Sequence, residues 1–282
     1  MPDERPVKDD GLNASRPAED WLHLNRSNWD ERVPIHVRSE LYDVPEFVLG
    51  KEPLYRFELR ELGDLAGKDV VHLQCHFGMD TLSLARKGAR VTGLDFSPPA
   101  LEAARKLATE VGLEARFVQA NVYDAVSALG ETYDLVYTGK GALNWLPDIG
   151  EWAAVVASLL RPGGALYLSE FHPLLFAFAD DDLLVEHPYF NEGPIVWDDG
   201  SDYADPAARI ESARTVEWPH PFSEVVSSVI EAGLRLEFLH EFRECGFARF
   251  PFLVESRPGL FVTPPGMPSL PMMYSLRAVK QP

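Results

Sequence analysis

Residues 69–97 read DVVHLQCHFGMDTLSLARKGARVTGLDFS, and this stretch decides the predicted fold. An apolar run is followed by a turn that contains Gly78, an amphipathic stretch, and a second apolar run that ends on Asp95. This order predicts a strand, a tight turn, a helix and a strand, the first half of a nucleotide-binding unit. Such turns usually carry three glycines. Here Gln74 and His76 fill the other two places.

Composition sets the frame around this unit. The chain has 282 residues, 46% of them hydrophobic, which is enough for one full α/β core. Its net charge of −18 argues against a nucleic-acid or acidic-membrane partner, because both surfaces repel anions. The two cysteines, Cys75 and Cys245, are far apart and favour a reducing compartment. With no apolar run of about 20 residues and no signal-peptide core, we expect a soluble cytoplasmic protein. Composition predicts nothing about the oligomeric state.

The pattern divides the chain into a tail, a helical cap and one α/β domain. Residues 1–18 are polar and contain proline, which predicts a mobile tail. Residues 19–66 read as an N-terminal helical cap, in which Pro34 limits any helix. Residues 67–282 form the α/β domain, and residues 172–220, rich in proline, acids and aromatics, interrupt it as an inserted lid.

Within the α/β domain, apolar runs alternate with amphipathic stretches. Pro98 and Pro99 suit the start of a helix, where an N–H is not needed, and Gly112 suits its end. The expected strands lie at 70–73, 90–94, 115–120, 133–138, 165–171, 234–242 and 272–280, and the expected helices lie at 80–87, about 98–112, 151–160 and 223–232.

Five motifs in this order resemble class I S-adenosylmethionine-dependent methyltransferases. They read VVHLQCHFG, VTGLDFS, FVQANVYD, YDLVYTG and LLRPGGALYLSEFHP, and the resemblance covers roughly residues 67–171. It implies an α/β fold with a Rossmann-like, mostly parallel seven-stranded sheet, helices on both faces and an antiparallel last strand. It further implies a small-molecule methyltransferase whose cofactor, S-adenosylmethionine, lies across the carboxyl ends of the first four strands.

The resemblance also implies a set of cofactor-binding residues. Asp95 ends the second strand, where a carboxylate accepts hydrogen bonds from ribose hydroxyls, and Gly78 lets a ligand approach the backbone. Asp80 either binds the methionine end of the cofactor or caps its helix. His76 is either a catalytic group or a wall of the site. The full predicted set is Gln74, His76, Gly78, Asp80, Thr81, Asp95, Phe96, Asn121, Val122 and Thr138.

The acceptor side is expected at the end of the fifth strand and under the lid. Glu170 is the predicted catalytic base, and His172 lies on the same side of that strand by alternation. Alternatively, Glu170 forms an ion pair or hydrogen bond with the N-terminal helices. Candidates from the cap for contact with cofactor or substrate are Trp29, Arg32, His36 and Tyr42.

The lid composition bears on the kind of acceptor. Its aromatic residues suit an apolar or aromatic small molecule of specialised metabolism, for example an alkene such as a prenyl diphosphate that is methylated on carbon. A small satellite core is the alternative. The acids at 180–182, with Glu186 and His187, suit magnesium only if the substrate is a diphosphate; otherwise they form a solvated loop. We expect no resident metal.

Three other functions stay open from the sequence. The chain is an O- or N-methyltransferase without an essential base, a nicotinamide-dependent oxidoreductase, or a non-catalytic relative that has lost the cofactor. The absence of a G-x-G-x-x-G turn and the terminal pair of strands weigh against the oxidoreductase. The altered turn motivates the non-catalytic relative.

Overall fold

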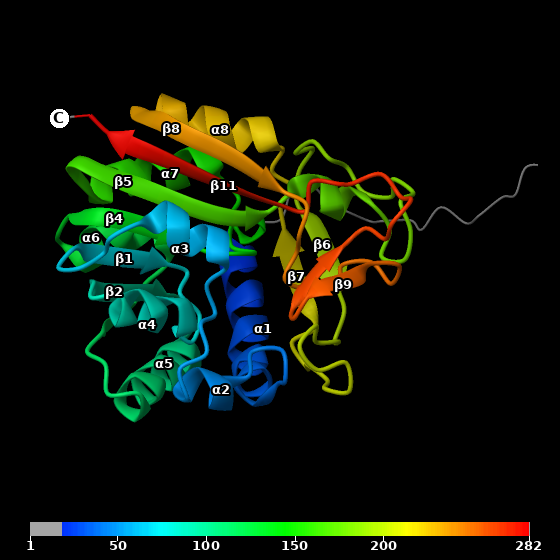
Figure 1. Ribbon diagram of the computed structural model, residues 1–282, viewed down its shortest axis with the longest axis horizontal. Coiled ribbons are helices and arrows are strands. Elements are labelled where there is room, and N and C mark those ends of the chain that lie inside the picture. Colours follow the sequence, from blue (N-terminus) through cyan, green and yellow to red (C-terminus); the bar gives the residue numbers. More distant parts are fainter. Residues whose placement is uncertain (1–18, 282) are drawn as a thin grey trace, which may run out of the picture.

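The computed structural model describes residues 19–281 and is built around one seven-stranded sheet (Figure 1). The strand order is β3-β2-β1-β4-β5-β11-β8. The strands are β1 (Asp69–Leu73), β2 (Arg90–Asp95), β3 (Arg116–Gln119), β4 (Tyr133–Thr138), β5 (Leu160–Phe171), β8 (Leu234–Phe242) and β11 (Met273–Lys280). The order reverses between β1 and β4, so the carboxyl ends of these strands flank the crevice where open α/β sheets bind ligands.

The last strand confirms the predicted architecture. β11 pairs antiparallel with both β5 and β8, with Leu276 opposite Leu168 on one side and Leu239 on the other. Five strands from β3 to β5 are parallel. The chain therefore has a mixed sheet with an antiparallel final strand inserted between two earlier ones.

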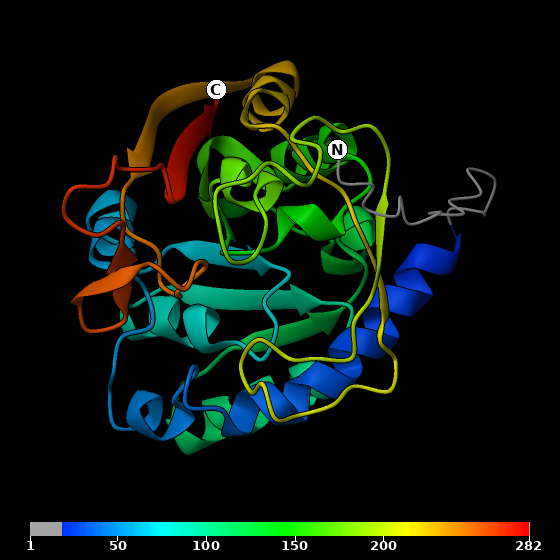
Figure 2. The ribbon, with the colours of Figure 1, turned by 90° about the vertical axis from the view of Figure 1, so that its right-hand side faces the viewer.

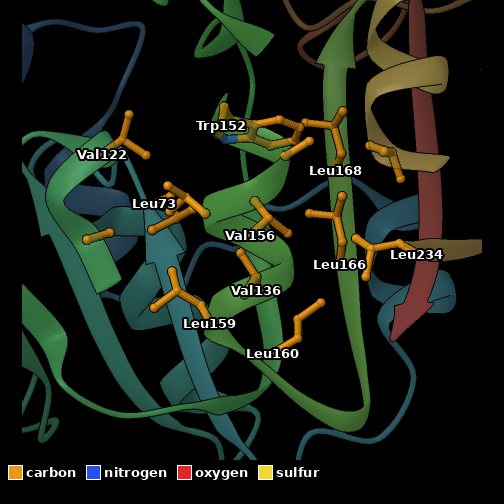
Figure 3. Close-up of a cluster of buried hydrophobic side chains, with 14 of the residues drawn as sticks. Leu73, Val122, Val136, Trp152, Val156, Leu159, Leu160, Leu166, Leu168 and Leu234 are labelled. Carbon is orange, nitrogen blue, oxygen red and sulfur yellow. The ribbon is translucent and has the colours of Figure 1, made fainter. Parts of the chain in front are cut away.

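Helices cover both faces of the sheet. On one face lie α6 (Ala125–Leu129), α7 (Ile149–Leu159) and α8 (Phe222–Glu231), and on the other lie α3 (Arg56–Leu62), α4 (Met79–Arg86) and α5 (Pro98–Glu110). Figure 3 shows the first face, where Trp152 of α7 packs near Leu168 of β5. Each fully buried side chain of this kind contributes roughly 1.5–3 kcal/mol. This core holds the strand ends in place.

The N-terminal cap contains a longer helix than the sequence predicts. Helix α1 (Glu19–Arg38) runs through Pro34, so the expectation that Pro34 limits the helix is wrong. Proline removes its own N–H bond and crowds the carbonyl of the preceding turn, which kinks a helix without always ending it. Val33 and His36 are buried on either side of it, and their packing keeps the last turn helical. A short helix, α2 (Val44–Val48), follows, and the predicted tail at 1–18 lies outside the described residues.

The predicted lid, residues 172–220, runs along α1. It contains a 3-10 turn, η3 (Pro173–Ala177), and a hairpin of β6 (Ile195–Asp198) and β7 (Arg214–Glu217). In Figure 2 this yellow-green segment lies beside the blue α1 helix. A second hairpin, β9 (Val254–Arg257) with β10 (Leu260–Val262), is an element that the sequence pattern did not predict. None of the helices within residues 19–281 combines the length and apolar character needed to cross a membrane.

Candidate functional site

The turn between β1 and α4 has the backbone shape of a glycine turn. Gln74, His76 and Gly78 have φ angles of 56°, 51° and 81°, all in the left-handed region that favours glycine. A Cβ on Gly78 would lie 3.0 Å from the Ala104 Cβ and from the Phe117 ring, so only glycine fits there. Gln74 and His76 therefore replace glycine in sequence without changing the course of the chain.

Asp95 holds this turn against the end of β2. Its carboxylate is 6% exposed and accepts hydrogen bonds from the backbone N–H of His76 at 2.7 Å and of Ser97 at 2.9 Å. Burial raises the pKa of Asp95 to about 6, and the two backbone N–H bonds oppose that rise. Each carboxylate oxygen has a second lone pair, so Asp95 is still able to accept hydroxyl hydrogen bonds.

Two buried polar atoms beside the turn lack partners. Gln74 donates from Nε2 to the Ala142 carbonyl at 2.9 Å, but its Oε1 makes no hydrogen bond within the described residues. The same is true of Thr138 Oγ1 at the end of β4. Unpaired buried polar atoms are rare, and each leaves hydrogen-bonding capacity for a ligand. The residues at this edge of the sheet thus fit a polar cofactor.

A buried charge cluster that the sequence reasoning missed lies next to Asp80. Lys140 Nζ is 3.0 Å from Asp80 Oδ2 and 3.2 Å from Glu58 Oε2, and Tyr137 donates to Glu58 at 2.9 Å. Burial opposes the charge on Lys140, but the two carboxylates raise its pKa overall. Asp80 makes no cap bond to its helix. The sequence feature that could have pointed to Lys140 is a lone lysine just after a strand in an acidic chain. No sequence feature pointed to Glu58.

The remaining predicted cofactor residues divide into two groups. Thr81 is fully buried, and its hydroxyl lies 2.8 Å from His72 Nδ1, so its prediction as a cofactor ligand is not supported. Val122 is buried in the main core, which leaves only its backbone available. Asn121 and Phe96 are partly exposed at the ends of β3 and β2, and Asn121 Oδ1 accepts from the Tyr123 N–H at 3.3 Å.

Glu170 does not have the environment of a catalytic base. Its two oxygens accept hydrogen bonds from the backbone N–H groups of Gly141, Ala142, Leu143 and Phe171, at 2.9 Å for Ala142 and 2.8 Å for Phe171. A carboxylate used this way fixes the loop after β4. Burial raises the pKa of Glu170, while the N–H bonds lower it. Glu170 thus positions the loop after β4, and its partners are not on the N-terminal helices; its role as the base stays a prediction.

His172 is likewise occupied at the end of β5. Its Nδ1 accepts from the Leu174 N–H at 3.2 Å, and its Nε2 lies 3.2 Å from Glu241 Oε1. Burial lowers the pKa of His172, and Glu241 opposes the change. These contacts cap η3 and tie β5 to β8, so the structure gives no support to a catalytic role for His172.

One face of α1 binds the lid through polar side chains. Asn25 donates to the Val216 carbonyl at 2.7 Å and accepts from the Val216 N–H at 2.8 Å. One turn later, Asn28 donates to the Ser212 carbonyl at 2.8 Å. Arg32 and His36 reach Asp202 at 3.1 Å and 3.0 Å. The spacing places all four on one side of the helix, which fixes the lid to the cap.

Aromatic rings from the cap meet the turn after β1. The Trp29 ring centroid lies 5.2 Å from that of His76 and 5.3 Å from that of Trp145, and Tyr42 lies 5.6 Å from His76. Of the cap candidates predicted from sequence, Trp29, His36 and Tyr42 thus surround His76. No signal in the sequence pointed to Trp145 or Asp202.

The lid aromatics do not gather around one pocket. Phe178 joins a satellite cluster with Leu175, Cys245 and Phe250, while Phe190 and Tyr203 are exposed. In the acid run, Asp180 pairs with Arg249 at 3.0 Å. Within residues 19–281, no group of three or more histidine, cysteine or acidic side chains is arranged to hold a metal ion.

Comparison with protein families gives one match at the core. A family model described as "Methyltransferase domain" matches residues 71–166. The ubiquinone biosynthesis O-methyltransferase of Aeromonas salmonicida is 36% identical over 107 residues, 38% of this chain and 44% of that protein. The Salmonella arizonae protein of the same name is 35% identical over 125 residues, 42% of this chain and 51% of its own length. The chain thus spans about half the length of the curated relatives it matches.

Solved structures share the fold over most of the chain. An S-adenosylmethionine-dependent methyltransferase of Mesorhizobium loti has a TM-score of 0.51 at 20% identity, covering 78% of this chain and 94% of that one. The 1,6-didemethyltoxoflavin N1-methyltransferase of Burkholderia thailandensis, solved with its substrate and S-adenosylhomocysteine, has a TM-score of 0.54 at 15% identity, covering 95% of this chain and 92% of that one. At these identities the likeness shows the fold.

Proposed function

We propose that this chain, which carries a class I S-adenosylmethionine-dependent methyltransferase domain, transfers a methyl group to a small-molecule acceptor. The observation that carries the proposal is the turn after β1, which keeps its left-handed backbone and rests on the Asp95 carboxylate. The non-catalytic alternative came from the missing glycines, and the retained left-handed backbone supports a turn that still binds the cofactor.

The residues at the strand ends have separate roles in holding S-adenosylmethionine. When bound, the cofactor supplies an electrophilic methyl group on a sulfonium. Asp95 accepts from the ribose hydroxyls, and the free Oε1 of Gln74 and the hydroxyl of Thr138 provide further polar contacts. Lys140 and Asp80 form a pair of opposite charges suited to the carboxylate and ammonium of the methionine end. Their side chains are 14% and 18% exposed, which leaves both within reach of a ligand.

The acceptor that we favour carries a hydroxyl group. The curated relatives are named as O-methyltransferases, and the lid is hydrogen-bonded to α1, whose Trp29 ring contacts the turn after β1. Methylation on carbon of a prenyl diphosphate is not retained, because Glu170 accepts hydrogen bonds from several backbone N–H groups. In addition, no three histidine, cysteine or acidic side chains within residues 19–281 are arranged to hold a metal ion. A hydroxyl-bearing acceptor therefore fits the residues of this site better than a prenyl diphosphate does.

Calorimetric titration tests the cofactor assignment directly. We expect S-adenosylhomocysteine to bind with measurable heat and to raise the melting temperature, while NADH produces neither effect. Binding of NADH without binding of S-adenosylhomocysteine would support the oxidoreductase. Absence of binding by both would support the non-catalytic relative. A panel of phenols, alcohols and amines, assayed with radiolabelled S-adenosylmethionine, then identifies the acceptor atom.

A further inference from the structure

Two imidazoles and a carboxylate from three separate segments form a chain of contacts at the turn. Asp202 of the lid lies 3.0 Å from His36 Nε2, and His36 Nδ1 of α1 lies 3.3 Å from His76 Nε2. Asp202 and His36 have no exposed side-chain surface. Glu170 and His172 are both engaged in hydrogen bonds, so this series of contacts is a candidate for acid–base chemistry near the cofactor turn.

The chain of contacts fixes the tautomer of each imidazole. An ionised Asp202 only accepts, so the proton of neutral His36 lies on Nε2 and its Nδ1 carries a lone pair. That lone pair accepts from His76 Nε2–H. The series of contacts then ends at the Nδ1 atom of His76, which makes no hydrogen bond to any residue in the 19–281 range. That lone pair is available to accept a proton from a ligand within hydrogen-bond reach.

The surroundings keep Asp202 ionised and the imidazoles of His36 and His76 neutral. Burial lowers the pKa of His36 and lowers that of His76 further, and Arg32 acts in the same direction on both. Burial opposes the charge on Asp202, but the hydrogen bonds from His36 and the Ala204 N–H, together with the charge of Arg32, lower its pKa overall. Asp202 therefore stays ionised while both imidazoles stay neutral.

The charged and titratable groups around the chain come from every element packed against it. Arg32 lies on α1, Asp202 and Tyr203 on the lid, and His72 on β1, where burial lowers its pKa to about 4. Tyr42 precedes α2 and stacks on His36 with a centroid distance of 5.0 Å. Arg32 is the cation among them and is paired with Asp202. A new positive charge on His76 would be stabilised by Asp202 through His36 and opposed by Arg32.

We propose that His76 Nδ1 takes the proton of a phenolic acceptor during methylation. This inference rests on the proposed function and adds the base and the acceptor class. The O–H bond breaks, its electron pair stays on oxygen, and the proton bonds to Nδ1; the imidazolium is stabilised through His36 by Asp202 and returns its proton to solvent after product release. Trp29, Tyr42 and Phe77 line His76 with rings, which suits a planar aromatic acceptor.

The lid completes this base. His76 and His36 belong to the turn and the cap, but Asp202, which sets the tautomers, is contributed by the lid. The backbone N–H of His76 also rests on Asp95, so the imidazole is fixed relative to the ribose carboxylate. The base is therefore assembled only when the lid lies on α1.

The test compares binding of two ligands by enzyme saturated with S-adenosylhomocysteine: para-nitrophenol and nitrobenzene, which lacks the hydroxyl. We expect the wild type to bind the phenol about tenfold more tightly, the effect of about one net hydrogen bond. His76→Asn suits the left-handed backbone, because asparagine tolerates that region, and should reduce the ratio to near one. His23→Asn, an exposed histidine on α1, should leave it unchanged.

A second readout follows the imidazole itself. In ¹⁵N NMR, para-nitrophenol should shift the Nδ1 resonance of His76 toward the protonated form, and Asp202→Asn should weaken this shift while leaving the turn intact. Equal affinity of the wild type for both ligands, or no binding of the phenol, overturns this inference when S-adenosylhomocysteine binds normally. If His76→Asn fails to fold, an unchanged shift in Asp202→Asn overturns it instead. Failure of S-adenosylhomocysteine to bind overturns the proposed function first.

Discussion

The carboxyl edge of the sheet and the contact between α1 and the lid are held together in different ways. At the sheet edge, single carboxylates organise backbone: Asp95 holds the turn after β1, and Glu170 holds the loop after β4. At the α1–lid contact, side chains on one helix face reach a segment about 190 residues away in sequence, as Asn25 does with Val216. The first arrangement orders the loops at the strand ends, and the second fixes residues 172–220 to the cap.

The largest expected effect is on the sheet-edge side. Replacing Asp95 with alanine removes the ribose acceptor and frees the N–H groups of His76 and Ser97. Hydrogen bonds to a charged group contribute about 1.5–3 kcal/mol each, so affinity for S-adenosylhomocysteine should fall about 100-fold. Calorimetry measures this affinity, and Glu102→Ala, which removes an exposed acid, is the matched control. Equal affinities in the two variants would contradict the assignment.

Glu170→Gln tests whether the second carboxylate positions rather than reacts. Glutamine has one acceptor oxygen where glutamate offers two, and its amide would face backbone N–H groups. We expect a loss of about 2–3 kcal/mol in the free energy of unfolding, measured by urea denaturation. Glu241→Gln, half exposed beside His172, is the control. A variant with unchanged stability but a large loss of turnover would restore Glu170 as the base.

Asn25→Ala should affect the lid and spare the sheet edge. It leaves the N–H and carbonyl of Val216 without partners, at a cost of about 2 kcal/mol. Hydrogen exchange at Val216 should become faster, while affinity for S-adenosylhomocysteine stays within about twofold. The neighbouring exposed Arg26→Ala is the control. A parallel loss of cofactor affinity would show that the two regions are not separate.

The smallest effect is a pH dependence carried by Asp95. Its pKa is raised from 3.8 to about 6, so the folded state holds this proton more tightly than the unfolded state does. The resulting destabilisation is absent below about pH 4, develops between pH 4 and 6, and is complete above that window. Cofactor affinity should change in the opposite direction, because Asp95 loses its charge as the pH falls. We expect the affinity to be about tenfold weaker at pH 5 than at pH 7. Asp95→Asn should remove this slope.

The same contrast explains what the sequence predicted. The strand order, the antiparallel last strand and Asp95 follow from apolar periodicity and turn residues, which act locally. Glu170 was placed at the correct strand end, but its partners, the N–H groups of residues 141–143, come from another loop. Asp202, Lys140 and the α1 face depend on pairs distant in sequence, so periodicity carried no information about them. Pro34 failed as a helix limit because packing outweighed the lost hydrogen bond.

The left-handed turn has a consequence for how the protein folds. Glycines adopt such a conformation even in short peptides, but residues such as Gln74 and His76 hold it at a cost on the order of 1 kcal/mol each. Here the compensating contacts come from Asp95 on β2 and Ala142 after β4. The turn therefore takes shape only after three strands have assembled. Its geometry is a cooperative property of the sheet and should be lost in a single step with it.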